Sequence, residues 1–208
     1  VYYYLSKVAD PTLAGDYRNR AVSTLEKARE TFTNEIFYHV LVQVYLDTFQ
    51  TAKAQTEADI LLLIKPNDEK TQAHFLAGRV ARAAGRYEKA AQHFEREIEN
   101  NPENDLAHAY LAAIYEEQLG RFKQALRIHL KRLKHNPGQI LPHEKIGDLY
   151  AGPLDEPQKA LPYYQRALKL AQMGERFPDK VQTLQMKINQ LQTKTGGREN
   201  TSKGNENE

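Results

Sequence analysis

The sequence predicts an all-α protein, an α-solenoid in which helical hairpins stack one after another. The first observation is a repeat, because Ala90, Ala125 and Ala160 stand at intervals of 35 residues. The second is an apolar stripe on each expected helix, formed four and eight residues after the alanine by Phe94 and Ile98, His129 and Leu133, and Tyr164 and Leu168. Such offsets place side chains on one helix face. Since one hairpin cannot cover its own apolar stripe, neighbouring hairpins must share a continuous core.

Glycine and proline mark the turns and ends of the hairpins. Gly85 and Gly120 lie between the expected helices, where glycine adopts a positive φ angle at little cost. Pro102 and Pro137 end two of the second helices, because proline cannot continue a helix. These signals predict two helices in each repeat, joined by a short turn.

The stretch from Ala73 to Pro102 resembles the tetratricopeptide repeat without a gap. The matching positions are Gly78 in the first helix (helix A), Gly85-Arg86-Tyr87 in the turn, and Ala90, Phe94 and Pro102 in and after the second helix (helix B). This stretch departs from the family where His74 replaces a tryptophan, Ala81 an aromatic residue and Glu97 a small residue. The resemblance implies a right-handed superhelix of such hairpins.

The repeats follow one another along the chain. A divergent first repeat, which reads as truncated, covers residues 1–34, with a helix from Asp16 to Phe32 and a partner helix at residues 2–8. Further repeats are expected at residues 35–68, 69–103, 104–138 and 139–175. The repeat at 104–138 has one extra residue before its turn, and the last repeat has a similar insertion at Gly152-Pro153. A capping helix is expected at residues 176–195 and a disordered tail at residues 196–208.

The expected C-terminal helix carries a narrow apolar seam, consisting of Val181, Leu184, Ile188 and Leu191. The seam fits a capping helix that covers the last repeat. It also fits a two-heptad seam for self-association, which would make the chain a homo-oligomer. From residue 196 onward no apolar side chain is available to pack, which is typical of a disordered tail.

Composition excludes several classes of protein. The net charge of +2 argues against a dedicated nucleic-acid binder, and the absence of cysteine excludes disulfides and thiolate zinc sites. No apolar run approaches the roughly 18 residues typical of a membrane span. Because the chain begins at Val1 without an initiator methionine, it reads as a fragment. We favour a cytoplasmic location, with a membrane-anchored or exported protein as the alternatives.

No constellation of residues indicates catalysis or metal binding. His74, His108 and His143 occupy nearly the same place in successive repeats, which are about 10 Å apart, whereas zinc ligands must lie within about 4 Å of one another. We interpret these rings as filling tryptophan-sized spaces between helices. The sequence contains neither a G-x-S-x-G elbow nor an H-E-x-x-H pair. We therefore expect a protein that is not an enzyme and has no cofactor.

The resemblance implies that helix A of each repeat lines a groove for a peptide or protein partner. The implied positions are Ile36, His39, Val40, Gln43 and Leu46; Phe75, Leu76, Arg79 and Arg82; Leu106, Ala109, Tyr110, Ala113, Glu116 and Glu117; and Leu141, Glu144, Lys145 and Asp148. The predicted partner-binding residues among them are His39, Gln43, Phe75, Arg79, Arg82, Tyr110, Glu117 and Lys145. Phe75, Arg79 and Tyr110 are the preferred anchors, because aromatic side chains and arginine dominate interface energies. Leu76 and Leu106 fit packing between repeats equally well.

Family members that bind chaperone tails hold a carboxylate with a fixed set of lysine, asparagine and arginine residues on successive A helices. The matching positions here are His39, Gln43, Leu76, Leu106 and Tyr110, or, one repeat later, Phe75, Arg79, Tyr110, Leu141 and Lys145. Even the second set retains at most one suitable cation. We therefore do not expect a carboxylate clamp.

One expected helix is basic over its whole length. Lys123, Arg127, Lys131 and Lys134 lie in a segment that has no carboxylate between residues 122 and 135. These cations would either complement the acidic helix before them or contact an acidic partner or a lipid headgroup. The sequence thus favours an adaptor or scaffold. A self-assembling structural module is the alternative, and an RNA- or lipid-contacting repeat protein is less favoured.

Overall fold

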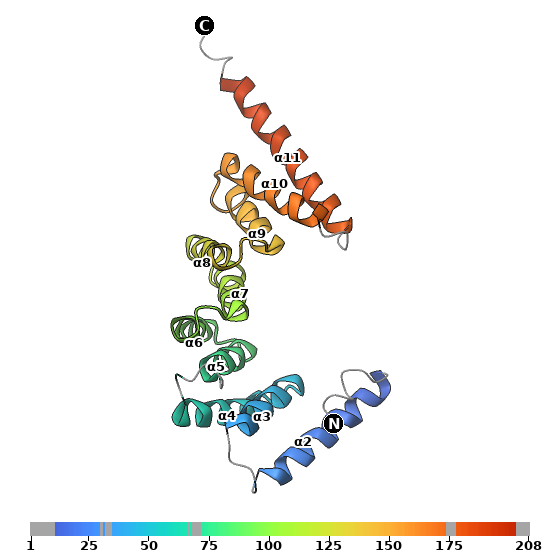
Figure 1. The fold of residues 1–208 in the computed structure, drawn as a ribbon, viewed down its shortest axis with the longest axis vertical. Helices are drawn as coiled ribbons and strands as arrows, with labels where there is room; N and C mark the ends of the chain where they lie inside the picture. Colours follow the sequence, from blue (N-terminus) through green and yellow to red (C-terminus); the bar gives the residue numbers. More distant parts are fainter. Residues whose placement is uncertain are drawn as a thin grey trace. The chain divides into compact units, whose positions relative to one another are not determined.

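The computed structural model describes residues 11–29, 31, 35–65, 67, 72–173 and 178–202, and every regular element in these ranges is helical (Figure 1). The elements are α2 (Pro11–Ala28), α3 (Glu35–Asp47), α4 (Thr51–Ile64), α5 (Ala73–Ala83), α6 (Tyr87–Asn100), α7 (Asp105–Ala113), η1 (Ile114–Gln118), α8 (Phe122–His135), α9 (Ile140–Ala151), α10 (Pro157–Met173) and α11 (Pro178–Ser202). The predicted all-α solenoid is confirmed. Contacts divide the chain into unit 1, residues 1–114, and unit 2, residues 115–208.

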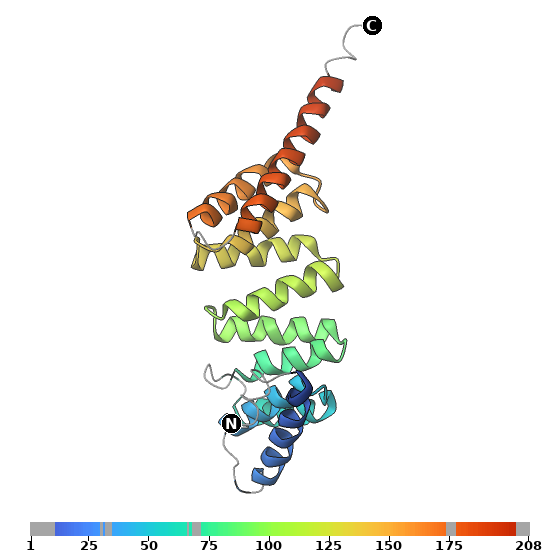
Figure 2. The same cartoon turned by 90° about the vertical axis from the view of Figure 1, so that its right-hand side faces the viewer.

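In unit 1, helices α3 and α4 form one hairpin and α5 and α6 the next, and within each unit successive helices lie in layers (Figure 2). The sequence expected the first helix at residues 16–32, but α2 runs from Pro11 to Ala28, since proline suits the first position of a helix. Val22 of α2 joins Leu41, Leu61 and Leu76 in one buried core. Helix α2 therefore packs on the following hairpin, whereas its expected partner at residues 2–8 lies outside the described residues.

Each described hairpin that contains a helix-A glycine is closed by a ring from helix B. A Cβ atom added at Gly78 would lie 2.8 Å from the Phe94 ring, and one added at Gly147 would lie 2.5 Å from the Tyr164 ring. Such distances are shorter than carbon atoms tolerate, so only glycine permits this approach. Phe94 and Tyr164 are both buried. The alanine-plus-ring pattern of the sequence thus corresponds to a close contact between two helices.

A backbone hydrogen bond closes each turn between helix A and helix B. The N–H of Gln50 donates to the carbonyl of Tyr45, and that of Arg86 to Ala81, each spanning five residues. The bond spans six residues from Arg121 to Tyr115 and from Glu156 to Tyr150. The longer spans occur in the two repeats whose sequences contain an extra residue before the turn.

The extra residue is accommodated differently in the two repeats. After α7 it widens the helix into the π-helix η1, because a π-helix holds one more residue per turn. After α9 it lengthens the turn at Gly152–Leu154. A positive φ angle stands just before helix B in both hairpins, at Gly120 (φ 61°) and at Asp155 (φ 49°). Glycine thus occupies the strained position in one turn, and aspartate tolerates it in the other.

The C-terminal helix α11 packs on α10 through the apolar seam. Leu184, Ile188 and Leu191 are buried in one cluster with Tyr164 and other side chains of α10. The backbone of α11 stays helical to Ser202, beyond residue 195 where the sequence predicted the helix to end. Extending an existing helix adds one hydrogen bond per residue without a new nucleus, so helix formation does not require an apolar face. The disordered tail predicted for residues 196–208 stays a prediction, and residues 203–208 lie outside the described residues.

Replacing Gly147 by alanine tests the close approach of helix A to the ring. The added Cβ atom overlaps Tyr164, so we expect the Gly147→Ala variant to lose about 1–3 kcal/mol of unfolding free energy. Chemical denaturation followed by circular dichroism measures the change. Gly15→Ala in α2 is the control, because a Cβ atom added at Gly15 has no neighbouring atom within 4 Å. Alanine also stabilises a helix by up to about 1 kcal/mol relative to glycine. Equal stability of the two variants would contradict the packing assignment.

Candidate interaction surfaces

Three A helices of unit 1 present one continuous face. Residues three, four or seven apart form a stripe on each helix. Gln43 on α3 accepts a hydrogen bond from Arg79 on α5, and the Arg82 guanidinium lies 5.0 Å from the ring of Tyr110 on α7. These contacts join the stripes side by side. We call this surface the A-helix face of unit 1; it comprises Ile36, Val40, Gln43, Phe75, Arg79, Arg82, Leu106 and Tyr110.

The centre of this face is an aromatic cluster. The rings of Phe94 and Tyr110 are stacked with centroids 5.4 Å apart, and the Phe75 centroid lies 5.8 Å from each of them. Phe75 is only 7% exposed, so its ring holds α5, α6 and α7 together and is not an open anchor. Tyr110 is half-buried and Arg82 is exposed. Of the aromatic anchors predicted from sequence, Tyr110 is therefore the accessible one.

Helices α3 and α7 also carry open apolar side chains. Ile36 is 72% exposed and Leu106 61%, and Val40 lies one turn beyond Ile36 with its side chain also exposed. Leu76, which sequence could not distinguish from Leu106, is buried in the core instead. His39 is half-buried on α3. The A-helix face of unit 1 thus combines exposed aliphatic groups with the guanidinium of Arg82.

The other two predicted site residues, Glu117 and Lys145, lie in unit 2. Glu117 is exposed, whereas the Nζ atom of Lys145 lies 3.2 Å from an oxygen of Glu116. The second Glu116 oxygen lies 2.6 Å from Nε2 of the buried His129. Burial by itself would raise the pKa of Glu116, but His129 and Lys145 hold it below its usual value. Lys145 therefore belongs to a structural network that begins in the π-helix.

Helix α11 supplies cations to the A-helix side of α9. Lys180 and Lys187 lie 2.8 and 2.9 Å from the two oxygens of the buried Glu144, and Lys187 also lies 2.7 Å from Asp148. Burial would raise the pKa of Glu144, yet the hydrogen bonds from both lysines lower it. Sequence placed Glu144 and Asp148 in a groove but missed Lys180 and Lys187. The available signal was their spacing of seven residues on a helix opposite two carboxylates spaced by four.

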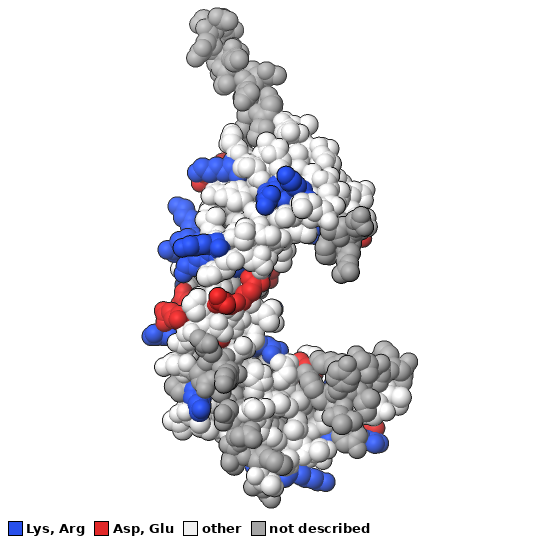
Figure 3. Space-filling model, in the orientation of Figure 1, with Lys and Arg blue, Asp and Glu red and all other residues white. Residues whose placement is uncertain are grey.

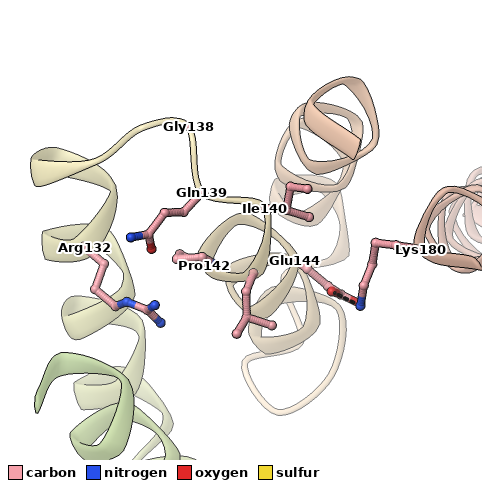
Figure 4. A pocket seen from close by; sticks show the side chains of 8 residues that line it. Arg132, Gly138, Gln139, Ile140, Pro142, Glu144 and Lys180 are labelled. Carbon is pink, nitrogen blue, oxygen red and sulfur yellow. Dashed lines mark hydrogen bonds and ion pairs between the residues drawn. The ribbon is translucent and has the colours of Figure 1, made fainter. Parts of the chain in front are cut away.

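A pocket of about 410 Å³ opens beside this network (Figure 4). Arg132 reaches it from α8 on one side and Lys180 from α11 on the other, with Ile140, Leu141 and Pro142 forming an apolar wall. Glu144 and Lys180 are already paired with each other. The buried Oε1 atom of Gln139 has no hydrogen-bond partner among the described residues. The pocket therefore offers an apolar wall and one acceptor oxygen.

The histidines fill spaces between helices. Nε2 of His108 lies 2.9 Å from the carbonyl oxygen of Pro102, and Nε2 of His143 lies 3.1 Å from that of Pro137. The equivalent His74 instead approaches His93, with their Nδ1 atoms 3.2 Å apart. Within the described ranges, no group of three or more potential metal ligands is assembled. None of the described helices is long and apolar enough to span a membrane.

Comparisons identify the kind of solenoid. A tetratricopeptide-repeat family model matches residues 70–139. One crystal structure of MamA superimposes with a TM-score of 0.69 at 18% identity, covering 80% of this chain and 96% of that chain. MamA from residue 41 onward, from Desulfovibrio magneticus RS-1, gives a TM-score of 0.57 at 16% identity, covering 76% of this chain and 93% of that chain.

A third solved structure is YrrB, described as a TPR protein with an unusual peptide-binding site, with a TM-score of 0.59 at 18% identity, covering 81% of this chain and 84% of that chain. No curated protein sequence matches the chain. The fold defines a helical-repeat solenoid. Together with the family match over residues 70–139, it supports the resemblance to the tetratricopeptide repeat that the residues around Ala90 suggested.

The His74–His93 pair predicts a pH dependence of stability. Burial, and then the charge of a protonated His74, lower the pKa of His93 to about 4 from an ordinary 6.5, and burial also lowers that of His74. Between these pH values the unfolded chain binds more protons than the folded one, so stability rises with pH. We expect His93→Gln to reduce the loss of stability between pH 6.5 and pH 4 by about 1–3 kcal/mol. Denaturation curves between pH 4 and pH 6.5 measure the unfolding free energy of wild type, His93→Gln and the control His39→Gln. If the unfolding free energy of His93→Gln changes with pH as steeply as that of wild type, the prediction is wrong.

Replacing Lys187 by methionine tests the network below α11. The variant leaves buried Glu144 with Lys180 alone, and we expect it to lose about 1–2 kcal/mol of unfolding free energy, since Lys187 is partly exposed. Lys194→Met is the matched control, because Lys194 is an exposed lysine on the same helix. Thermal unfolding compares the two variants. A loss of the same size in both would show that the ion pairs contribute nothing.

Proposed function

We propose that this chain is an adaptor or scaffold that binds a peptide or protein segment on the A-helix face of unit 1, and that it acts by binding rather than by catalysis. The observation that carries the proposal is that Ile36 on α3 and Leu106 on α7 are exposed on the same A helices that carry the Tyr110–Arg82 pair and its neighbours. Large aliphatic groups normally leave water when a protein folds. Their exposure beside an aromatic ring and an arginine, the residue types that dominate binding energy, favours a docking surface.

The side chains of this face indicate the chemistry of the partner. Apolar contacts would come from Ile36, Val40 and Leu106, and Arg82 would donate hydrogen bonds to a carboxylate of the partner. Arg79 is already held by Gln43, so it would position the face rather than carry the charge contact. A segment with aliphatic side chains and an acidic residue next to them fits best. The peptide-binding site described for YrrB, which shares the fold, supports peptide binding as the mode.

Self-assembly through the α11 seam is the alternative that sequence left open. Leu184, Ile188 and Leu191 are buried against α10, so dimerisation through them would require α11 to leave its own core. Because these three side chains are already buried against α10, moving them into a dimer interface would bury no additional apolar surface. This observation favours the adaptor over the self-assembling module.

A substitution on the A-helix face tests the proposal. Peptides that bind the wild-type chain can be selected from a displayed random library and their affinities measured by titration calorimetry. We expect Leu106→Glu to weaken these peptides at least about tenfold, because it removes an apolar contact and adds a charge beside the carboxylate they bring.

The matched control is Leu63→Glu, since Leu63 is 84% exposed on helix B of the same unit. This variant should bind the selected peptides within about twofold of wild type. Circular dichroism should show that both variants have the same helix content as wild type. Equal affinity of Leu106→Glu and wild type, or an equal loss in both variants, would refute the assignment of the A-helix face.

A further inference from the structure

Helix α8 of unit 2 exposes a row of cations along one face. Lys123, Arg127, Lys131 and Lys134 are all exposed. None of the four makes an ion pair or a hydrogen bond with another described residue. Figure 3 shows the Lys and Arg side chains gathered over this helix. We call these four residues the α8 basic row.

The spacing of the row is regular. Steps of four, four and three residues keep the side chains on one helix face, with a rise of about 6, 6 and 4.5 Å between neighbours. The row is therefore about 16 Å long and one side chain wide. Of the large apolar side chains of α8, Leu130 alone is exposed, and it lies between Arg127 and Lys134 on the same side.

This arrangement is unfavourable for the isolated helix. Like charges four residues apart repel one another, and α8 has no carboxylate among its residues to separate them. Lys123 lies in the first turn, where the positive end of the helix dipole disfavours a cation, and that turn has no acidic residue. Sequence left open that an acidic helix of the same chain would neutralise these cations. They remain unpaired among the described residues, so their charges are available to a partner from outside.

We propose that the α8 basic row binds an acidic helix of another protein, whose carboxylates recur every four residues. Such carboxylates are spaced by about 6 Å, close to the row's steps of about 6, 6 and 4.5 Å, so each would meet one cation of the row. An aliphatic side chain on the acidic helix would pack on Leu130. Electrostatic matching of this kind sets the rate and specificity of association. This surface lies on a B helix of unit 2 and is distinct from the A-helix face of unit 1.

A protein helix fits the row better than other polyanions. Proteins that bind single-stranded nucleic acid combine basic grooves with exposed aromatic rings on which bases stack. Helix α8 has one aromatic residue, Phe122, and its ring is half-buried. Membrane-surface helices insert a broad apolar face, whereas α8 exposes one leucine. A single row of charges is matched by another helix.

Binding of defined probes to the full chain tests the proposal. The probe is a fluorescent alanine-based helical peptide with four glutamates placed every fourth residue. The comparison peptide has the same composition with its four glutamates adjacent. Anisotropy titrations at 50 mM salt should show at least about fivefold tighter binding of the spaced peptide, and binding should weaken about tenfold at 500 mM salt. Failure of the spaced peptide to bind at 50 mM salt would overturn the proposal.

Two fourfold variants with the same net charge separate the row from overall charge. The row variant carries Lys123→Glu, Arg127→Glu, Lys131→Glu and Lys134→Glu, and the control carries Lys89→Glu, Arg166→Glu, Lys169→Glu and Lys194→Glu at exposed sites elsewhere. The row variant should lose at least about tenfold in affinity, and the control should stay within about threefold of wild type. Equal losses would mean that net charge alone attracts the peptide, which overturns the proposal.

A single variant keeps the test independent of folding. Lys123→Glu should raise the Tm by roughly 1–2 °C, because an acidic residue suits the first helical turn, while weakening the spaced peptide about threefold. An oligonucleotide of poly-U and vesicles containing phosphatidylserine are titrated in parallel. If poly-U or the vesicles bind more tightly than the spaced peptide, and the row variant loses this binding, the partner is not an acidic helix and the proposal is overturned. The Leu106→Glu variant should bind the spaced peptide like wild type. Failure of the proposal for the A-helix face of unit 1 can therefore be distinguished from failure of the proposal for the α8 basic row.

Discussion

The structure depends on how closely helix A can approach helix B within a hairpin. Glycine at 78 and 147 lets the rings of Phe94 and Tyr164 lie directly against the backbone of the partner helix. Alanine at positions 90 and 160 keeps the other side of the contact small, and both alanines are fully buried. Because the α5–α6 and α9–α10 hairpins both make this contact, it sets the spacing of their helices, and the stripes that each hairpin cannot cover alone become the shared core.

The repeats at 104–138 and 139–175 each have an extra residue before the turn, and the backbone there adopts a different conformation in each repeat. One repeat absorbs it as a π-helix and the other as a longer turn, while the ring-to-glycine contact between α9 and α10 is kept. The π-helix has a consequence, since it contains Glu116, whose carboxylate contacts both His129 and Lys145. An insertion that would disrupt a coiled coil is therefore tolerated here, and it introduces a buried polar network into unit 2.

The two units use their A helices differently. In unit 1 the A-helix face keeps Ile36, Leu106 and Arg82 exposed. In unit 2 the polar side chains of α9 are occupied, since Lys180 and Lys187 of α11 neutralise Glu144 and Asp148. A carboxylate with two ammonium partners offers little to a further ligand. Helix A thus provides an open surface in one unit and holds the C-terminal helix in the other.

The sequence by itself determined the helical hairpins and their 35-residue period, because a small residue followed by a ring at helical spacing is a local pattern that only a packed hairpin satisfies. It could not decide whether a groove position is open or buried. Phe75 and Tyr110 were both predicted as groove anchors, yet Phe75 is enclosed between Phe94 and Tyr110, and Tyr110 remains half-exposed. Burial and ion pairing depend on residues far away in the chain, as with Lys187 and Glu144, so only the tertiary structure decided which side chains of the repeats remain available to a partner.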